Sequence, residues 1–170
     1  LQRQRLSAVK PFIKGRVLDF GCGPGQLSSF VNSEYYVGFD SDSDILKVSK
    51  ENFPSKKFVA VLPEDSVKFD TIICLAVVEH LKNPAETMQD LVRRLKPQGQ
   101  IVLTTTYPAY EFIHTVGAKI GIFSLAASEE HEEMFDKNLL SKLADEIGLS
   151  MVHYKRFLFG ANQLAIFSGA

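Results

Sequence analysis

The sequence has 170 residues and a formal net charge of −1 at pH 7, a length that suits one domain with a single large core. Because positive and negative charges balance, the protein has no electrostatic field of one sign that would attract nucleic acid or an anionic membrane. Two cysteines, Cys22 and Cys74, are too few for a disulfide framework and indicate reduced thiols. Without a signal peptide or spanning segment in the sequence, we expect a cytoplasmic protein.

The first elements lead to a glycine-rich turn. Apolar residues at helical spacing predict an amphipathic helix over residues 1–13, and an apolar run predicts a buried parallel strand at 16–20. A second helix is expected at about 25–32, with its N-terminal amides facing a ligand. The end of the strand is joined to this second helix by the stretch Asp19-Phe20-Gly21-Cys22-Gly23-Pro24-Gly25. Its three glycines permit backbone conformations and a close ligand approach that side chains would block.

The spacing of these glycines distinguishes two classes of binding site. The dinucleotide fingerprint is Gly-x-Gly-x-x-Gly, whereas here the third glycine comes one residue early and Gln26 takes the next position. Asp19 would repel a pyrophosphate but suits a cationic ligand. The stretch resembles the first motif of class I S-adenosylmethionine (SAM) dependent methyltransferases, apolar-apolar-(Asp/Glu)-x-Gly-x-Gly-x-Gly. A NAD(P)-dependent oxidoreductase and a glycine turn without a ligand are the alternatives.

The resemblance implies that SAM binds around this turn and leaves as S-adenosylhomocysteine (SAH). The cofactor contacts expected there are Asp19, Phe20, Gly21, Cys22, Gly23, Gly25 and Gln26. The second predicted strand, residues 35–40, ends on Asp40, which would accept hydrogen bonds from both ribose hydroxyls, with Ser41 along the adenine. Alternatively, Asp40 only opens the run of aspartates and serines that caps the next helix.

The adenine side departs from the family pattern. Many relatives carry an aspartate soon after the third strand, which is predicted here at residues 57–61, and Leu62 occupies that position. Leu62 could supply main-chain groups, Asp65 could reach in from the loop, or the segment is a solvated turn. Leu75, at the end of a continuously apolar fourth strand at 69–75, is a further expected cofactor contact.

The segment Ala76-Val77-Val78-Glu79-His80-Leu81 resembles Val-x-Glu-His-Leu of small-molecule methyltransferases. In ubiquinone-type O-methyltransferases the pattern is Glu-x-x-Glu-His, proposed to hold a divalent metal. Ala76 stands at the first glutamate, which leaves too few side-chain ligands, so we expect no metal. His80 is a candidate catalytic residue; the alternative is that Glu79 and His80 fix the next helix and shape the pocket floor.

The remaining elements complete an α/β fold. Asn83-Pro84-Ala85-Glu86 predicts a capping box for a helix that reaches Leu95 and is ended by residues 96–99. A fifth strand is expected at 101–106. We then expect a last helix, capped by Asp136 and stopped by Gly148. A final hairpin follows, with strands expected at 149–159 and 162–168.

These elements predict a single domain over residues 1–170, with a doubly wound, Rossmann-like, seven-stranded sheet and helices on both faces. The resemblance implies the strand order 3-2-1-4-5-7-6 with strand 7 antiparallel. Residues 107–135 exceed the length of an ordinary connection, which favours a substrate lid at the carboxyl edge of the sheet. Alternatives are that this stretch is core, or that residues 109–123 contact a second subunit or a membrane peripherally.

The lid would carry the acceptor contacts. Candidate substrate-binding residues are Tyr107, Tyr110, His114 and Phe123. His131 is a second candidate catalytic residue by resemblance, although its four neighbouring glutamates would favour its protonated form. An exposed histidine in an acidic loop is the alternative.

The resemblance implies methyl transfer by in-line displacement from SAM to an oxygen or nitrogen of a small-molecule acceptor, including aromatic or lipid-like ones. A general base is needed only for a weakly acidic hydroxyl or a protonated amine. We expect no nucleic-acid partner and a monomer or homodimer. A SAM-binding or partner-binding module without turnover is a further alternative.

Overall fold

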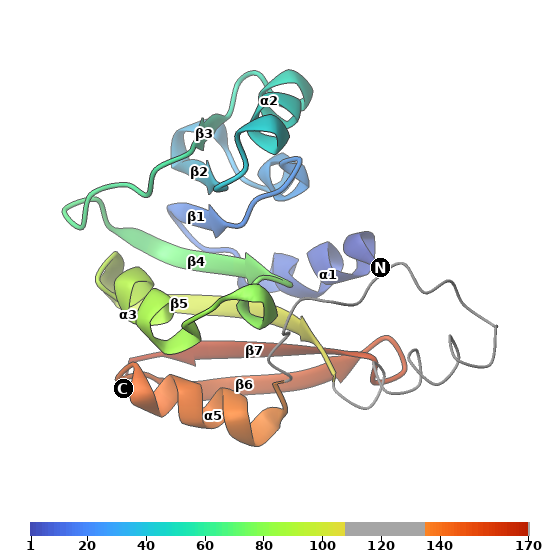
Figure 1. The fold of residues 1–170 in the computed structure, drawn as a ribbon, viewed down its shortest axis with the longest axis vertical. Helices are drawn as coiled ribbons and strands as arrows, with labels where there is room; N and C mark the ends of the chain where they lie inside the picture. Colours follow the sequence, from blue (N-terminus) through green and yellow to red (C-terminus); the bar gives the residue numbers. More distant parts are fainter. Residues whose placement is uncertain (108–134, 170) are drawn as a thin grey trace.

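The computed structural model describes residues 1–107 and 135–169. One seven-stranded sheet runs through the molecule in the order β3-β2-β1-β4-β5-β7-β6 (Figure 1). Strand β7 is antiparallel to both β5 and β6, and the other neighbours pair in parallel. The predicted fold, strand order and antiparallel strand are confirmed.

The elements have these bounds. The strands are β1 (Val17–Phe20), β2 (Tyr36–Phe39), β3 (Lys57–Val59), β4 (Phe69–Leu75), β5 (Leu95–Thr106), β6 (Ser150–Phe157) and β7 (Asn162–Ser168). The helices are α1 (Gln2–Val9), α2 (Ser43–Asn52), α3 (Pro84–Val92) and α5 (Lys137–Glu146), with short 3₁₀ helices η1 (Lys10–Phe12), η2 (Gln26–Phe30), η3 (Ser33–Tyr35) and η4 (Val78–His80).

Helices cover both faces of the sheet because successive strand residues point to opposite sides. Leu18 and Ile72 belong to the core that also holds Met88 of α3 and Leu140 of α5. The neighbouring strand residues belong to a second core with α1, η2 and α2. In Figure 1, α3 and α5 lie in front of the sheet and α1 lies behind it. The central strands are therefore buried on both sides, as their apolar sequences predict.

The segment after the glycine turn differs from the prediction. The helix expected at 25–32 is the five-residue 3₁₀ helix η2. Gly25 enters it with a left-handed φ of 85°, and Val31 leaves it in an extended conformation with its side chain buried. A 3₁₀ helix this short has too few aligned peptide groups to present a helix dipole to a ligand.

The start of β5 also differs from the prediction. The helix α3 ends at Val92, and Leu95, expected on its last turn, pairs with Phe69 at the start of β5. The amide of Phe69 donates to the carbonyl of Arg94 at 2.9 Å, so the sheet captures this segment before the predicted helix stop. The expected capping box is absent. The side-chain amide of Asn83 donates to Glu86 Oε2, and the Asn83 side chain makes no hydrogen bond to the main chain of the first turn.

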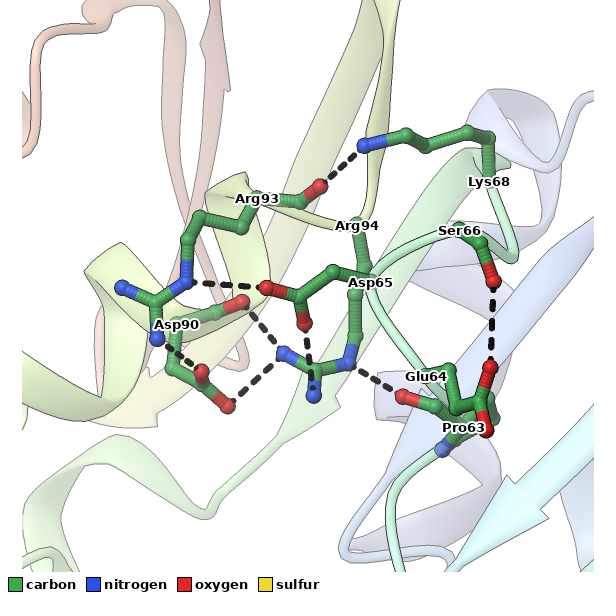
Figure 2. Close-up of polar contacts among 8 residues, drawn as sticks. All are labelled: Pro63, Glu64, Asp65, Ser66, Lys68, Asp90, Arg93 and Arg94. Atoms are coloured by element: carbon green, nitrogen blue, oxygen red, sulfur yellow. Dashed lines mark hydrogen bonds and ion pairs between the residues drawn. The ribbon is translucent and has the colours of Figure 1, made fainter.

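A buried arginine joins the loop after β3 to the end of α3. Arg94 is 8% exposed, and Figure 2 shows its guanidinium between two carboxylates. It lies 2.9 Å from Asp65 Oδ1 and 2.8 Å from Asp90 Oδ2, and it donates to the carbonyl of Pro63 at 2.7 Å. The expectation that Asp65 could reach the adenine is at odds with this pairing, because both its oxygens bind Arg93 and Arg94.

Candidate functional site

The glycine turn after β1 is tied to the end of β2. The amides of Gly21 and Cys22 donate to the carbonyl of Phe39 at 2.8 and 2.9 Å. The amide of Gly23 donates to Asp40 Oδ2 at 2.9 Å. The turn is thus shaped by main-chain contacts with the neighbouring strand, which fixes its position at the carboxyl edge of the sheet.

The three glycines of the turn have different roles. All three have positive φ. A Cβ at Gly21 would lie 2.5 Å from Val77 Cγ2, and one at Gly25 would lie 2.7 Å from Phe58, so both positions are closed by packing. A Cβ at Gly23 would meet no atom within 4 Å. Gly23 therefore presents its main chain to open space, where a ligand can approach it.

A cavity of about 410 Å³ opens beside this turn, a size typical of small-molecule sites. Its lining residues are Leu1, Gln2, Arg5, Leu6, Asp19, Gly21, Cys22, Gly23, Gln26, Leu27, Leu75, Ala76 and His80. The cavity thus brings together six of the predicted cofactor residues, the candidate catalytic histidine His80, and Arg5, which sequence reasoning missed.

Asp19 is the buried acid of this cavity. It is 2% exposed, and the hydroxyl of Tyr36 donates to its Oδ2 at 2.7 Å. Burial raises the pKa of Asp19 to about 7, the hydrogen bond from Tyr36 opposes the rise, and the charge of Asp40 adds to it. Asp19 is therefore poised between its two charge states near neutral pH.

Arg5 is a half-buried cation that lines the same cavity. Its Nε donates to Asn162 Oδ1 at 2.8 Å and its Nη2 to Thr106 Oγ1 at 3.2 Å. Burial lowers its pKa, and the charge of Glu79 opposes this. An arginine remains protonated under such shifts. A carboxylate and a guanidinium in one cavity match the ammonium and carboxylate of a free amino-acid group, so the residues present fit the amino-acid end of SAM.

Asp40 lies at the end of β2, outside the residues that line the cavity. Its Oδ1 accepts from the amide of Asp42 at 3.1 Å, and its Oδ2 accepts from Gly23. The cap of α2 is supplied by Asp42, whose Oδ1 accepts from the amides of Asp44 and Ile45. Asp40 is thus not required as the helix cap, the alternative considered for it, and it links that helix to the glycine turn.

Other predicted cofactor residues lie away from the cavity. The side chain of Phe20 is buried in the core on the α3 face and stacks on Phe39 at 5.2 Å, which leaves only its main chain near the turn. Leu62 is half-buried against the same core. Ser41 is exposed next to Asp40, and Gly25 packs against Phe58.

Glu79 and His80 lie on η4, just after β4. Glu79 is 6% exposed, and burial raises its pKa, while contacts including the Thr105 hydroxyl and the charges of His80 and Arg5 lower it. His80 lines both the cavity and a groove of about 1360 Å³ between α3 and α5. Within residues 1–107 and 135–169, no group of three or more His, Cys, Asp or Glu residues is arranged to hold a metal ion.

Most of the predicted acceptor side lies outside the described residues. This applies to Tyr110, His114, Phe123 and His131. Tyr107 is half-buried; its amide donates to the carbonyl of Ala161 at 2.9 Å, and the Arg156 guanidinium lies 3.5 Å from its ring centroid. No helix in the described part of the chain is long and apolar enough to cross a membrane.

Comparisons with known proteins show the family of the chain. Residues 2–154 match the family of methyltransferase domains. A ubiquinone biosynthesis O-methyltransferase from Coxiella burnetii is 24% identical over 161 residues, which cover 84% of this chain and 69% of that protein.

Solved structures share the fold. The magnesium protoporphyrin IX methyltransferase from Synechocystis, crystallised with SAH, superposes with a TM-score of 0.72 at 15% identity, covering 99% of this chain and 84% of that one. A possible histamine N-methyltransferase from Thermotoga maritima gives a TM-score of 0.75 at 15% identity, covering 98% and 87%. The chain therefore belongs to the methyltransferase domain family, which confirms the predicted class of SAM-dependent methyltransferase.

Proposed function

We propose that the chain binds SAM in the cavity beside the glycine turn and transfers its methyl group to a small-molecule acceptor. The observation that carries the proposal is the pair of opposite charges, Asp19 and Arg5, in one cavity with the open main chain of Gly23. Asp19 would hold the ammonium of the cofactor and Arg5 its carboxylate. The Asp19 carboxylate would repel the pyrophosphate of a dinucleotide seated at this turn, which disfavours the oxidoreductase alternative.

The nucleoside would lie toward the end of β2. A carboxylate offers about four lone-pair sites, and two of those on Asp40 are used by the amides of Gly23 and Asp42. We therefore assign the ribose hydroxyls to Asp40, with Ser41 and the main chain of Leu62 along the adenine. The amides of Gly21 and Cys22 position the turn and do not reach out to the ligand.

Bound SAM supplies a methyl group on a positively charged sulfur, which a nucleophilic acceptor atom displaces in line. The contribution of this chain is position and exclusion of water: Asp19 and Arg5 fix one end of the cofactor, and apolar Leu75 lines the cavity wall. Orientation alone supplies effective molarities up to ~10⁵–10⁸ M. A site without water also favours a step in which charge disappears, as the positive charge on the sulfur of SAM does during methyl transfer.

The acceptor would enter from the side of His80, which lines both the cavity and the groove between α3 and α5. We propose His80 and His131 as the residues that take a proton from an acceptor hydroxyl, and Tyr107, Tyr110, His114 and Phe123 as acceptor contacts within an acceptor-binding insertion at 107–135. The ubiquinone biosynthesis relatives support O-methylation of an aromatic, lipid-like acceptor. Because Ala76 replaces the first glutamate of Glu-x-x-Glu-His, we expect activity without a divalent metal.

Formation of SAH tests the proposal. The purified chain is incubated with SAM and a series of phenols and catechols with and without isoprenoid tails, and SAH is measured by mass spectrometry. We expect SAH with at least one tailed phenol, and much slower formation by the Asp40→Ala variant when SAM is kept below its dissociation constant. SAM binding without turnover on any acceptor would favour the non-catalytic module, and a change in NADH fluorescence without stabilisation by SAM would favour the oxidoreductase.

A further inference from the structure

Tyr36 lies behind the cofactor cavity and is not one of its lining residues. It is 1% exposed, on β2, and its hydroxyl reaches Asp19 Oδ2 on β1 at 2.7 Å. Asp19 pairs with Gly38 in the sheet. Tyr36 comes two residues before Gly38, so its phenol reaches Asp19 diagonally across the two strands. This bond uses Oδ2 and leaves Oδ1 of Asp19 available to a ligand in the cavity.

The path of the phenol depends on a glycine. A Cβ at Gly38 would lie 2.8 Å from Tyr36 Oη and 2.7 Å from Phe58 Cδ1. Phe58 packs edge-on against the Tyr36 ring, with centroids 5.7 Å apart and an interplanar angle of 72°. The side-chain-free surface of Gly38 and the Phe58 ring thus hold the phenol in the one direction that reaches the Asp19 carboxyl.

We propose that Tyr36 is a positioning residue for the cofactor: its hydroxyl, 2.7 Å from Asp19 Oδ2, holds the Asp19 carboxylate toward the ammonium of SAM. Because this carboxyl is only 2% exposed, binding of the ammonium favours its ionised form and releases to solvent a proton that it carries in the free protein. This inference rests on the proposed function, because it takes Asp19 as the partner of the SAM ammonium. The same hydrogen bond that orients Asp19 also stabilises its ionised form.

The charge states around Asp19 are consistent with this coupling. Burial raises the pKa of Asp19 to about 7 against the opposing hydrogen bond from Tyr36. Burial and the charge of Asp19 raise the pKa of Tyr36, so the phenol stays protonated and remains a donor. The other ionisable groups that face this carboxyl or line its cavity are Asp40 after β2, Cys22 in the turn, Cys74 on β4, Arg5 on α1 and His80 on η4.

Proton release by the unmodified protein is the first test. Titration calorimetry with SAM at pH 7, in buffers of different ionisation enthalpy, should report the release of about half a proton per SAM bound, because Asp19 is about half protonated there. The dissociation constant should increase about fivefold from pH 7 to pH 6, a range in which the α-amino group of SAM stays mostly protonated. SAM binding without proton release and without this pH dependence would overturn the inference and leave the proposed function intact.

The variant Tyr36→Phe isolates the hydroxyl, because it keeps the ring against Phe58. Without the hydrogen bond Asp19 is harder to ionise, so we expect SAM affinity about fivefold lower at pH 7, nearly equal to that of the unmodified protein at pH 9, and release of close to one proton at pH 7. Tyr154→Phe is the matched control, since it removes a hydroxyl that donates to Gln163 Oε1 at 2.9 Å away from the cavity. The control should leave SAM affinity unchanged at every pH.

A second ligand separates positioning from general support of the fold. 5′-Methylthioadenosine keeps the nucleoside but has no ammonium, so Tyr36→Phe should leave its affinity unchanged. An equal, pH-independent loss for SAM and 5′-methylthioadenosine would overturn the inference. If Tyr36→Phe does not fold, the proton-release measurement decides alone. No binding of SAM to the unmodified protein at any pH would overturn the inference together with the proposed function.

Discussion

The main-chain amide of Gly23 lies 2.9 Å from Asp40 Oδ2, and this bond joins the two parts of the cofactor site. The glycine turn follows β1 and the acid follows β2, and sequence reasoning treated them as separate contributors. In the structure the acid also shapes the turn. Loss of the Asp40 carboxylate is therefore expected to affect both the ribose contact and the main chain at Gly23.

Asp40→Ala should weaken SAM binding more than tenfold, because it removes the proposed acceptor for both ribose hydroxyls and the anchor of Gly23. Calorimetry measures the change. Asp42→Ala is the control: it removes the cap of α2, which costs about 1 kcal/mol of stability, and should leave SAM affinity unchanged. Equal affinities for the unmodified protein and Asp40→Ala would refute the ribose assignment.

Gly23→Val should abolish SAM binding while the fold is kept, because the side chain would enter the open space at the turn. The strain of a valine at φ 51° destabilises the chain by about 1–2 kcal/mol. Gly148→Val is matched to it, since Gly148 has φ 75° and also meets no atom within 4 Å, at the end of α5. Similar melting temperatures with binding lost only in Gly23→Val would place the cofactor at the turn; retained binding would remove it from there.

Arg5→Met should reduce SAM affinity about tenfold or more, because the carboxylate of the cofactor loses a half-buried guanidinium. Binding of 5′-methylthioadenosine, which has no carboxylate, should be little affected. Arg3→Met changes an exposed arginine on the same helix and should alter neither affinity. A comparable loss for both ligands in Arg5→Met would indicate that Arg5 acts through its bonds to Asn162 and Thr106 instead.

Asp19→Asn should stabilise the ligand-free protein at pH 8 while abolishing SAM binding. The folded-state pKa of Asp19, about 7, lies above its value in the unfolded chain, so the folded state binds the extra proton and stability falls as the pH rises from about 4 to about 7. Removing the charge recovers up to about 4 kcal/mol above pH 7 and little near pH 4. Urea unfolding at both pH values measures this; a gain of the same size at both would contradict the shifted pKa.

Arg94→Met should lower the free energy of unfolding by about 2 kcal/mol, because it removes the buried guanidinium that joins Asp65, Asp90 and the Pro63 carbonyl (Figure 2). Arg93→Met is the control, because Arg93 is exposed although it pairs with the same two aspartates; exposed pairs contribute about 0–1 kcal/mol. Urea unfolding of both variants gives the comparison, and equal losses would show that burial of Arg94 adds nothing.

Much of the fold could be predicted from sequence because its signals are local. Apolar strands that alternate with capped helices predict the doubly wound sheet, and Asp136 and Gly148 bound α5 as expected. The errors arise where a distant partner decides the structure. Leu95 has a helical pattern with the residues before it, but pairing with Phe69 places it in β5. Asn83 is an exception: it has the sequence of a helix cap, yet its side chain bonds Glu86, three residues later.

The same distinction applies to the site. Asp19, Gly21 and Gly23 belong to a contiguous motif, and in the structure they line one cavity. Arg5 carries no motif signal, because its contacts with Thr106 and Asn162 join distant parts of the chain. Tyr36 was assigned only to an apolar strand, and its role depends on the absence of a side chain at Gly38. A glycine inside a strand marks close approach by another group, and that signal could have identified it.

The bond between Arg5 and Asn162 also bears on how the protein matures during synthesis. Its partners are separated by 157 positions in the sequence, so the wall of the cavity that holds Arg5 is assembled only after the strand β7 has left the ribosome and inserted beside β5. Domains generally fold as units during translation, and contacts of large sequence separation form late. A nascent chain that already displays the complete glycine turn would still lack a fixed Arg5, so tight cofactor binding would begin only after β7 has been synthesised.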